Sequence, residues 1–140
     1  MSKVAVIGGG AGGMMAACIA AGNGHRVTLF EQNEKLGKKI YITGKGRCNL
    51  TNACDTEDLF AAIMKNAKFL YSAIYTFDNH ALMDYFAGLG LKMKIERGNR
   101  VFPQSDHASD VIRVLTDELH RKKVRICLNT KVQEIVSDGT

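Results

Sequence analysis

The chain has 140 residues, of which 46% are hydrophobic and 24% are charged, and its formal net charge is +5. This length fits one domain, and the composition is that of a folded globular protein, which excludes a disordered chain, a collagen-like repeat and a heptad array. Fourteen glycines stand against one proline, a ratio that indicates tight backbone sites that favour glycine.

The apolar N-terminus is interrupted by glycines from Gly8 to Gly13, which is not the pattern of a secretory signal peptide. No apolar stretch reaches the roughly 18 residues that a membrane span needs. None of the four cysteines forms a CxxC pair, so the sequence predicts no metal site. We therefore expect a cytoplasmic protein with reduced thiols and no membrane partner.

Residues 1–31 have the pattern of a βαβ unit. Val4–Ile7 is a short apolar run rich in β-branched residues and predicts a buried parallel strand. Good helix formers follow over residues 14–21, and residues 26–30 predict a second strand. Glu31 stands at the C-terminal end of that second strand.

The connection between the first strand and the helix carries a G-x-G-x-x-G pattern. Gly8 permits a tight turn, Gly10 lets the backbone approach a pyrophosphate, and Gly13 lets the helix pack close to the sheet. The first helical N–H groups offer a partial positive charge to phosphates. The pattern predicts that a dinucleotide binds here, and the candidate cofactor-binding residues are Gly8, Gly10, Ala11, Gly12 and Gly13.

Glu31 follows Gly13 by 18 residues, which is close to the spacing of the acid in dinucleotide-binding folds. Its carboxylate can accept hydrogen bonds from ribose hydroxyls and would repel a 2′-phosphate. The sequence therefore predicts FAD or NAD rather than NADP, with the Glu31 side chain exposed when the site is empty.

Residues 44–52 read Gly-Lys-Gly-Arg-Cys-Asn-Leu-Thr-Asn and resemble the GxGRCNxTN signature of a bacterial flavoprotein family. Residues 98–105 resemble the G-R-x-F-P-x-S segment of the same family, which is labelled NAD(P)/FAD-dependent oxidoreductase or aminoacetone oxidase family FAD-binding enzyme. The resemblance implies an α/β, Rossmann-like FAD-binding domain with a parallel sheet and a helical insertion. It also implies a flavin-dependent oxidoreductase with a small-molecule substrate, for which NAD(P)H is a candidate reductant.

The resemblance also implies roles for individual residues. Gly46, Arg47, Cys48 and Asn49 would lie near the pyrophosphate and the flavin, and Val132 would give a backbone contact to the adenine. Cys48 and Cys54 are separated by five residues rather than by the four of the disulfide reductases. We therefore expect Cys48 to line the flavin site without redox chemistry, and the residues identify no catalytic acid or base.

The rest of the chain is too long for one crossover helix, and we divide it into a flavin-contact loop over residues 32–54, a helical insertion over 55–97, and a helix with a third strand over 105–136. Helices are predicted over 56–66, over 67–77, after a cap at Asp78 or Asn79, and after a cap at Ser105 or Asp106. Strands are predicted over 91–96 and over 124–128, the latter beside the second strand.

The alternating residues 132–136 predict a strand, and Asp138-Gly139 is a hairpin turn signal without a returning strand. We therefore expect the domain to be incomplete at its C-terminus, inactive alone, and able to associate through open sheet edges. Two alternatives stay open: an NAD-dependent dehydrogenase domain, and an FAD-binding module of an RNA-modifying protein, which fits the pI of about 9.1. The basic run 121–123 favours a solvated helix end, so nucleic acid is not an expected partner.

Overall fold

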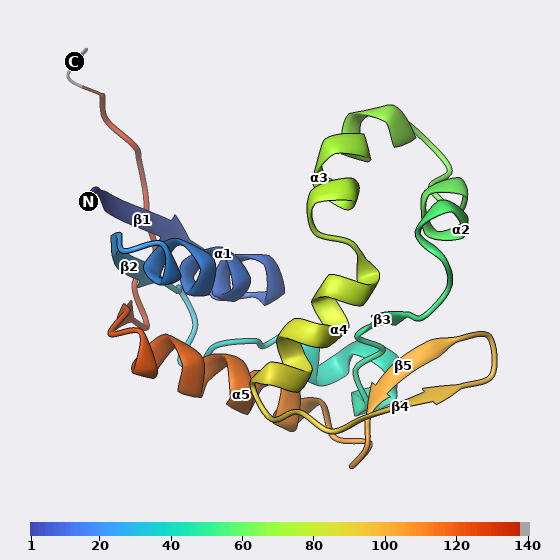
Figure 1. The fold of residues 1–140 in the computed structure, drawn as a ribbon. Helices are drawn as coiled ribbons and strands as arrows, with labels where there is room; N and C mark the ends of the chain where they lie inside the picture. The colour runs from blue at the N-terminus through green and yellow to red at the C-terminus, as the bar shows by residue number, and fades with distance from the viewer. Residues whose placement is uncertain (138–140) are drawn as a thin grey trace. The chain divides into compact units, whose positions relative to one another are not determined.

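The computed structural model describes residues 1–137 (Figure 1). The turn predicted at Asp138-Gly139 lies outside the described residues. The chain divides into two compact units, which are described separately below. The first unit comprises Met1–Tyr41 and Leu115–Thr140, and the second comprises Ile42–Val114.

The first unit contains a parallel three-stranded sheet. Its strands are β1 (Lys3–Ile7), β2 (Arg26–Phe30) and β6 (Arg125–Cys127), in the order β1-β2-β6. The register pairs Val6 with Leu29, and Leu29 with Ile126. The predicted Rossmann-like α/β fold is confirmed, and so is the position of the third strand beside the second, which the right-handed crossover rule requires.

Helix α1 (Ala11–Gly22) packs against β1 and β2 (Figure 1). Met14, Ala17 and Cys18 on this helix are fully buried, and the Cys18 Sγ lies 3.9 Å from the carbonyl oxygen of Leu115. Small residues on α1 let the helix come close to the strands. This packing fixes the start of α1 beside the C-terminal end of β1.

Strand β1 is less buried than its sequence predicts. Val4 and Val6 are half-buried, but Ala5 and Ile7 alternate with them and are exposed, with Ile7 at 53%. Apolar runs in parallel strands normally have both faces covered. Among the described residues of this unit, elements cover only the face that carries Val4 and Val6, so the prediction of a buried strand is wrong for the other face.

The second unit contains an antiparallel sheet of β3 (Thr51–Asn52), β5 (Arg100–Pro103) and β4 (Met93–Glu96), in the order β3-β5-β4. Strand β4 confirms the core of the strand predicted over 91–96. The hairpin from β4 to β5 was not predicted, although Gly98 at φ 75° and Asn99 at φ 57° form its turn. Gly-Asn between two short strands is a recognised turn signal.

The helices of the second unit are shorter than predicted. The helix predicted over 56–66 ends at Ala61, and the helix predicted over 67–77 is a 3₁₀ turn followed by an α-helix. The break between the two predicted helices falls at Asn66, which is left-handed at φ 55°. The third prediction is confirmed, since Asp78 Oδ1 accepts a hydrogen bond of 2.8 Å from the Ala81 backbone N–H and caps the helix. The bounds are α2 (Thr56–Ala61), the 3₁₀ helix η2 (Ala67–Leu70), α3 (Tyr71–Thr76) and α4 (Asn79–Gly88).

Helix α5 (Ala108–Arg121) starts in the second unit and ends in the first. It begins after both predicted caps, and Ser105 Oγ instead accepts a 3.2 Å hydrogen bond from the His107 backbone N–H in the preceding turn. The strand predicted over 132–136 is not formed, because no described strand pairs with that segment. None of the helices in the described part of the chain has the length and apolar character that a membrane span requires.

Candidate functional site

The glycine loop between β1 and α1 is built from backbone constraints. Gly8 has φ +99°, a conformation that L side chains rarely adopt, and its N–H donates a 2.8 Å hydrogen bond to the Phe30 carbonyl. A Cβ on Gly13 would lie 1.8 Å from the Gly8 carbonyl oxygen and 3.5 Å from Val6 Cγ1. The loop itself therefore requires glycine at both positions, for the reasons that the sequence predicts.

Gly10 and Gly12 have no such reason to be glycine. A Cβ built on either residue meets no atom within 4 Å, and the φ of Gly10 is an ordinary −81°. Their open side lies at the start of α1, which has no side-chain cap and no acidic residue in its first turn. Unpaired N–H groups at an uncapped helix start suit a phosphate, so this cradle fits the predicted pyrophosphate.

Glu31 ties the end of β2 to the glycine loop. Its Oε2 accepts a 2.6 Å hydrogen bond from the Gly9 N–H, and its Oε1 accepts bonds from the Asn33 backbone N–H at 2.8 Å and from the Asn33 side chain at 2.6 Å. Burial by itself raises the pKa of Glu31, but these hydrogen bonds outweigh it and hold the pKa below its usual range. The carboxylate is therefore ionised at neutral pH.

The side chain of Glu31 is buried, with 7% of the residue exposed, so the prediction of an exposed acid is wrong. The reason is local packing, because Leu36 and Gly9 lie so close that a Cβ on Gly9 would come within 2.4 Å of Leu36 Cδ2. No local pattern of residues predicts this contact. Glu31 consequently has a structural task in addition to the predicted ribose contact.

The segment that leads to Val132 runs beside Glu31. The Glu31 N–H donates a 2.9 Å hydrogen bond to the Cys127 carbonyl, and the Thr130 N–H donates a 2.8 Å bond to the Glu31 carbonyl. Val132 is half-buried and follows Thr130 by two residues. The structure thus brings together the glycine loop, Glu31 and the segment of Val132, whereas the contact of Val132 with adenine stays a prediction.

Residues 43–49 form a loop of the second unit that falls within the predicted flavin-contact loop of residues 32–54. This loop partly overlaps the 3₁₀ helix η1 (Ile40–Gly46), which begins in the first unit. Its backbone is left-handed at Gly44 and Gly46, and also at the non-glycine residues Lys45, with φ 57°, and Cys48, with φ 59°. Such conformations are disfavoured for side-chain-bearing residues and persist where the surroundings hold them. The loop is therefore held in place by contacts outside its own backbone.

Polar side chains of this loop bind to the second unit itself. Arg47 Nε donates a 2.7 Å hydrogen bond to Asp106 Oδ1, and Arg47 Nη2 forms an ion pair with Glu96. With the Asn49 amide oriented so that its nitrogen faces two backbone carbonyls, it donates to Thr51 at 3.0 Å and to Val101 at 3.2 Å. Sequence reasoning missed Glu96 and Asp106, which lie 49 and 59 residues after Arg47 and carry no local signal.

Cys48 is buried in this loop. Burial raises the pKa of the Cys48 thiol above its usual value, although a hydrogen bond with Thr43 works in the opposite direction. The group is therefore a neutral thiol at neutral pH, which is a poor nucleophile. All four cysteines are free thiols, so Cys48 has the environment of a structural or flavin-lining residue.

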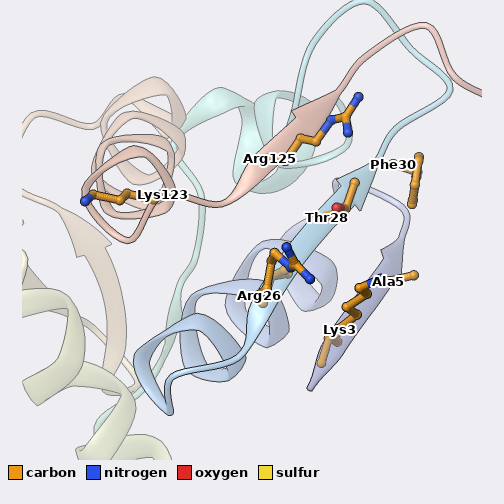
Figure 2. A pocket seen from close by; sticks show the side chains of 9 residues that line it. Lys3, Ala5, Arg26, Thr28, Phe30, Lys123 and Arg125 are labelled. Carbon is orange, nitrogen blue, oxygen red and sulfur yellow. The ribbon is translucent and has the colours of Figure 1, made fainter. Parts of the chain in front are cut away.

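A hollow of about 530 Å³ lies on the open face of the first unit's sheet (Figure 2). Its cations form no ion pair with any described acidic residue, and its wall contains no carboxylate, cysteine or histidine. Within residues 1–137, no cluster of His, Cys, Asp or Glu is placed to hold a metal ion. The side chains labelled in Figure 2 are Lys3, Ala5, Arg26, Thr28, Phe30, Lys123 and Arg125.

Comparison with family models gives one match over nearly the whole chain. The model described as "HI0933-like protein Rossmann domain" matches residues 2–140. It covers both the glycine loop with Glu31 and the loop of residues 43–49.

Several curated relatives match over 96% of the chain. The chain is 38% identical over 137 residues to the 3-dehydro-bile acid delta(4,6)-reductase of Clostridium scindens. It is 30% identical over 135 residues to the ribosomal RNA dihydrouridine synthase of Escherichia coli. The chain spans 33% of the length of each relative.

Among solved structures, the open conformation of a flavocytochrome c3 fumarate reductase matches 99% of the chain with a TM-score of 0.71. The sequence identity is 20%, and 28% of that chain is covered. At this identity the likeness shows the fold alone.

Proposed function

This chain belongs to the family of HI0933-like Rossmann domains, the FAD-binding domain of flavin oxidoreductases, and on that premise we propose how it holds FAD. The backbone N–H groups at the start of α1 bind the pyrophosphate, which occupies the space beside Gly10 and Gly12. The observation that carries this proposal is that a Cβ on either glycine would meet no atom of the protein. The fold itself does not require glycine at these two positions, whereas a phosphate bound close to the backbone would require it.

Glu31 binds the adenosine ribose in this proposal. Its Oε2 accepts one hydrogen bond, from Gly9, and a carboxylate oxygen has room for a second. A ribose hydroxyl would donate to that free position. Because the lowered pKa keeps Glu31 ionised, a 2′-phosphate would be repelled, which favours FAD over NADP at this loop.

FAD supplies the redox chemistry when it is bound, and the described residues bind it and orient it. We propose that NAD(P)H is the electron donor and that the protein acts in the cytoplasm. The remaining two thirds of the relatives' length would carry the substrate site, so the 140 residues alone would not turn over substrate. The roles of Gly46, Arg47, Cys48 and Asn49 toward the flavin, and of Val132 toward adenine, stay predictions.

The test compares two glycines that are both open in the structure. Gly10→Val adds a side chain into the proposed phosphate space, whereas Gly88→Val adds one at the end of α4, where a Cβ also meets no atom within 4 Å. We expect Gly10→Val to weaken FAD binding by about 100-fold or more, which corresponds to roughly 3 kcal/mol. Gly88→Val should leave the affinity unchanged.

Titration of FAD into the purified protein, followed by flavin fluorescence, measures both affinities. The melting temperature of each variant shows that it is folded. Equal FAD affinity for the wild type and Gly10→Val would show that the pyrophosphate binds elsewhere.

A second candidate function is reduction of a base in RNA, favoured by the 30% identity to a ribosomal RNA dihydrouridine synthase. The unpaired cations of the hollow in Figure 2 are a candidate surface for the phosphate backbone. Binding of ribosomal RNA that weakens steeply between low and moderate salt would support this function. An affinity for RNA no greater than that for heparin, at the same salt, would exclude a specific RNA substrate.

A proposal on association follows from the open edges of the first unit's sheet. In the order β1-β2-β6, β1 is an edge strand, and its residues Ala5 and Ile7 are exposed. We propose that copies of the 140-residue chain associate through these open sheet edges. Size-exclusion chromatography with light scattering would show a mass above 15.3 kDa, and a monomer at all concentrations would contradict the proposal.

A further inference from the structure

Arg47 belongs to a cluster of four charged side chains in the second unit. Arg47 Nη2 lies 2.6 Å from Asp106 Oδ1 and also pairs with Glu96. Lys94 Nζ lies 2.5 Å from Asp106 Oδ2 and 3.4 Å from Glu96 Oε1. Two cations face two carboxylates, so the cluster has no formal net charge left over for an anion.

The guanidinium of Arg47 is also fixed by an aromatic ring. Its Cζ lies 4.1 Å from the centroid of Phe102, a buried residue of β5. Cation–π stacking and bidentate hydrogen bonding both depend on the planar shape of arginine, and lysine cannot reproduce the two together. The Arg47 side chain thus has a single orientation set by β4, β5 and the turn before α5.

These contacts hold the loop of residues 43–49, whose backbone adopts left-handed conformations that are disfavoured for residues with side chains. Arg47 lies between the left-handed residues Gly46 and Cys48, and its N–H donates to the Gly44 carbonyl at 3.2 Å. The loop is joined to β5 by a second link, the 2.8 Å hydrogen bond from the Leu50 N–H to the Val101 carbonyl. Without the acids of the cluster, the Phe102 ring would be the one contact named above that still holds the Arg47 side chain, and the loop could relax toward ordinary backbone angles.

We propose that Arg47 is a positioning residue rather than a phosphate ligand, and that Glu96 and Asp106 control FAD affinity by holding Arg47 and, through it, the loop of residues 43–49. The proposal rests on the proposed function only in assuming that this loop contacts FAD. The proposal predicts whether FAD binding weakens or tightens when the two acids are removed. Removing the two acids should loosen the loop and weaken FAD binding, whereas a phosphate-binding arginine freed from its acids would bind FAD more tightly.

The test uses the near-isosteric variants Glu96→Gln and Asp106→Asn, singly and together, with Asp110→Asn as the control. Asp110 lies on α5 and pairs with Arg113 and Ser105, not with Arg47. Hydrogen exchange of the amides of residues 44–49 without FAD reports loop order, and FAD titration reports affinity. A further variant, Arg47→Lys, keeps the positive charge but loses the planar guanidinium that forms paired hydrogen bonds and stacks on Phe102.

We expect the double variant and Arg47→Lys to speed loop exchange by about tenfold and to weaken FAD binding by about fivefold or more, while Asp110→Asn changes neither. Unchanged exchange in the double variant would overturn the positioning role. Unchanged FAD binding in the double variant would overturn the claim that the two acids control FAD affinity. Tighter binding in the double variant, or full retention of affinity by Arg47→Lys, would show that Arg47 acts as a charge on the phosphate. If the wild type binds no FAD, the proposed function fails while the exchange data still decide whether the cluster holds the loop.

Discussion

The two glycine-rich loops of this chain look alike in sequence but are built in opposite ways. The loop after β1 carries no side-chain anchor of its own: backbone contacts and the Glu31 carboxylate from the end of β2 hold it, and the sides of Gly10 and Gly12 stay open. The loop of residues 43–49 is shaped by its side chains, since Arg47 and Asn49 both bind to the second unit. A glycine-rich motif therefore does not by itself tell which atoms face a ligand. The better indication is how many polar groups of the motif already form hydrogen bonds with the protein, because only the others are left for a ligand.

Among the variants that test this difference between the loops, Gly13→Ala is expected to have the largest effect on stability. The added Cβ would lie 1.8 Å from the Gly8 carbonyl oxygen, and backbone on both sides must move to avoid it. We expect a loss of about 3 kcal/mol or more in the free energy of unfolding, at the upper end for an overpacked site. Urea denaturation of Gly13→Ala and Gly10→Ala measures the contrast, and equal stability of the two variants would contradict the backbone origin of the first loop.

A smaller effect is expected from Glu31→Gln, because the amide would place an N–H₂ group against the donors of Gly9 or Asn33. Losing hydrogen bonds to a buried charged group costs about 1–3 kcal/mol, and FAD affinity should fall by a similar free energy. The matched control is Glu34→Gln, whose carboxylate forms an exposed ion pair with Lys38. Urea denaturation without FAD that gives the same free energy for both variants would show that Glu31 does not hold the loop.

The third prediction concerns the stability of the protein at acidic pH. Burial tends to raise the pKa of Glu31 but its hydrogen bonds lower it overall, and hydrogen bonds from Lys94 and then Arg47 lower the pKa of Asp106. A carboxyl group whose pKa is lowered on folding stabilises the protein above its ordinary pKa of about 4, and this contribution disappears as the pH falls toward the lowered value. Glu31→Gln and Asp106→Asn should therefore differ from the wild type at pH 7 and converge with it below about pH 4.

Thermal melts across this pH range measure the convergence. A stability difference that stays constant from neutral to acidic pH would mean that neither carboxylate is ionised in a stabilising contact.

The smallest effect is expected at Cys48. Its buried, neutral thiol should react with iodoacetamide more slowly than the half-buried Cys54, and Cys48→Ser should change turnover of the enzyme by less than about tenfold. Mass spectrometry of partly alkylated protein gives the order of reaction. Faster alkylation of Cys48, or loss of nearly all turnover with FAD still bound, would make it a reactive centre.

The βαβ unit was predictable because its information is local. Glycine is required at Gly8 and Gly13 by backbone angles and backbone atoms only a few residues away. The elements β1, α1 and β2 follow in the expected order. The hairpin of β4 and β5 was also available from the Gly98-Asn99 turn signal, although it was not predicted.

The partners of the second loop could not be predicted, because Arg47 meets Glu96 and Asp106 only after β4 and β5 have formed. The burial of Glu31 was missed for a related reason, since it depends on how Leu36 packs over Gly9. Side-chain environment is a property of tertiary packing, whereas the glycine pattern is a property of the local backbone.

The most direct test of the central claim is the identity of the small molecule that the glycine loop retains. The purified protein would be heated to release its ligand, which would then be identified by mass, for the wild type and Gly10→Val in parallel. The account predicts FAD from the wild type and little or none from Gly10→Val. NAD or NADP from the wild type, or equal amounts of FAD from both proteins, would contradict it.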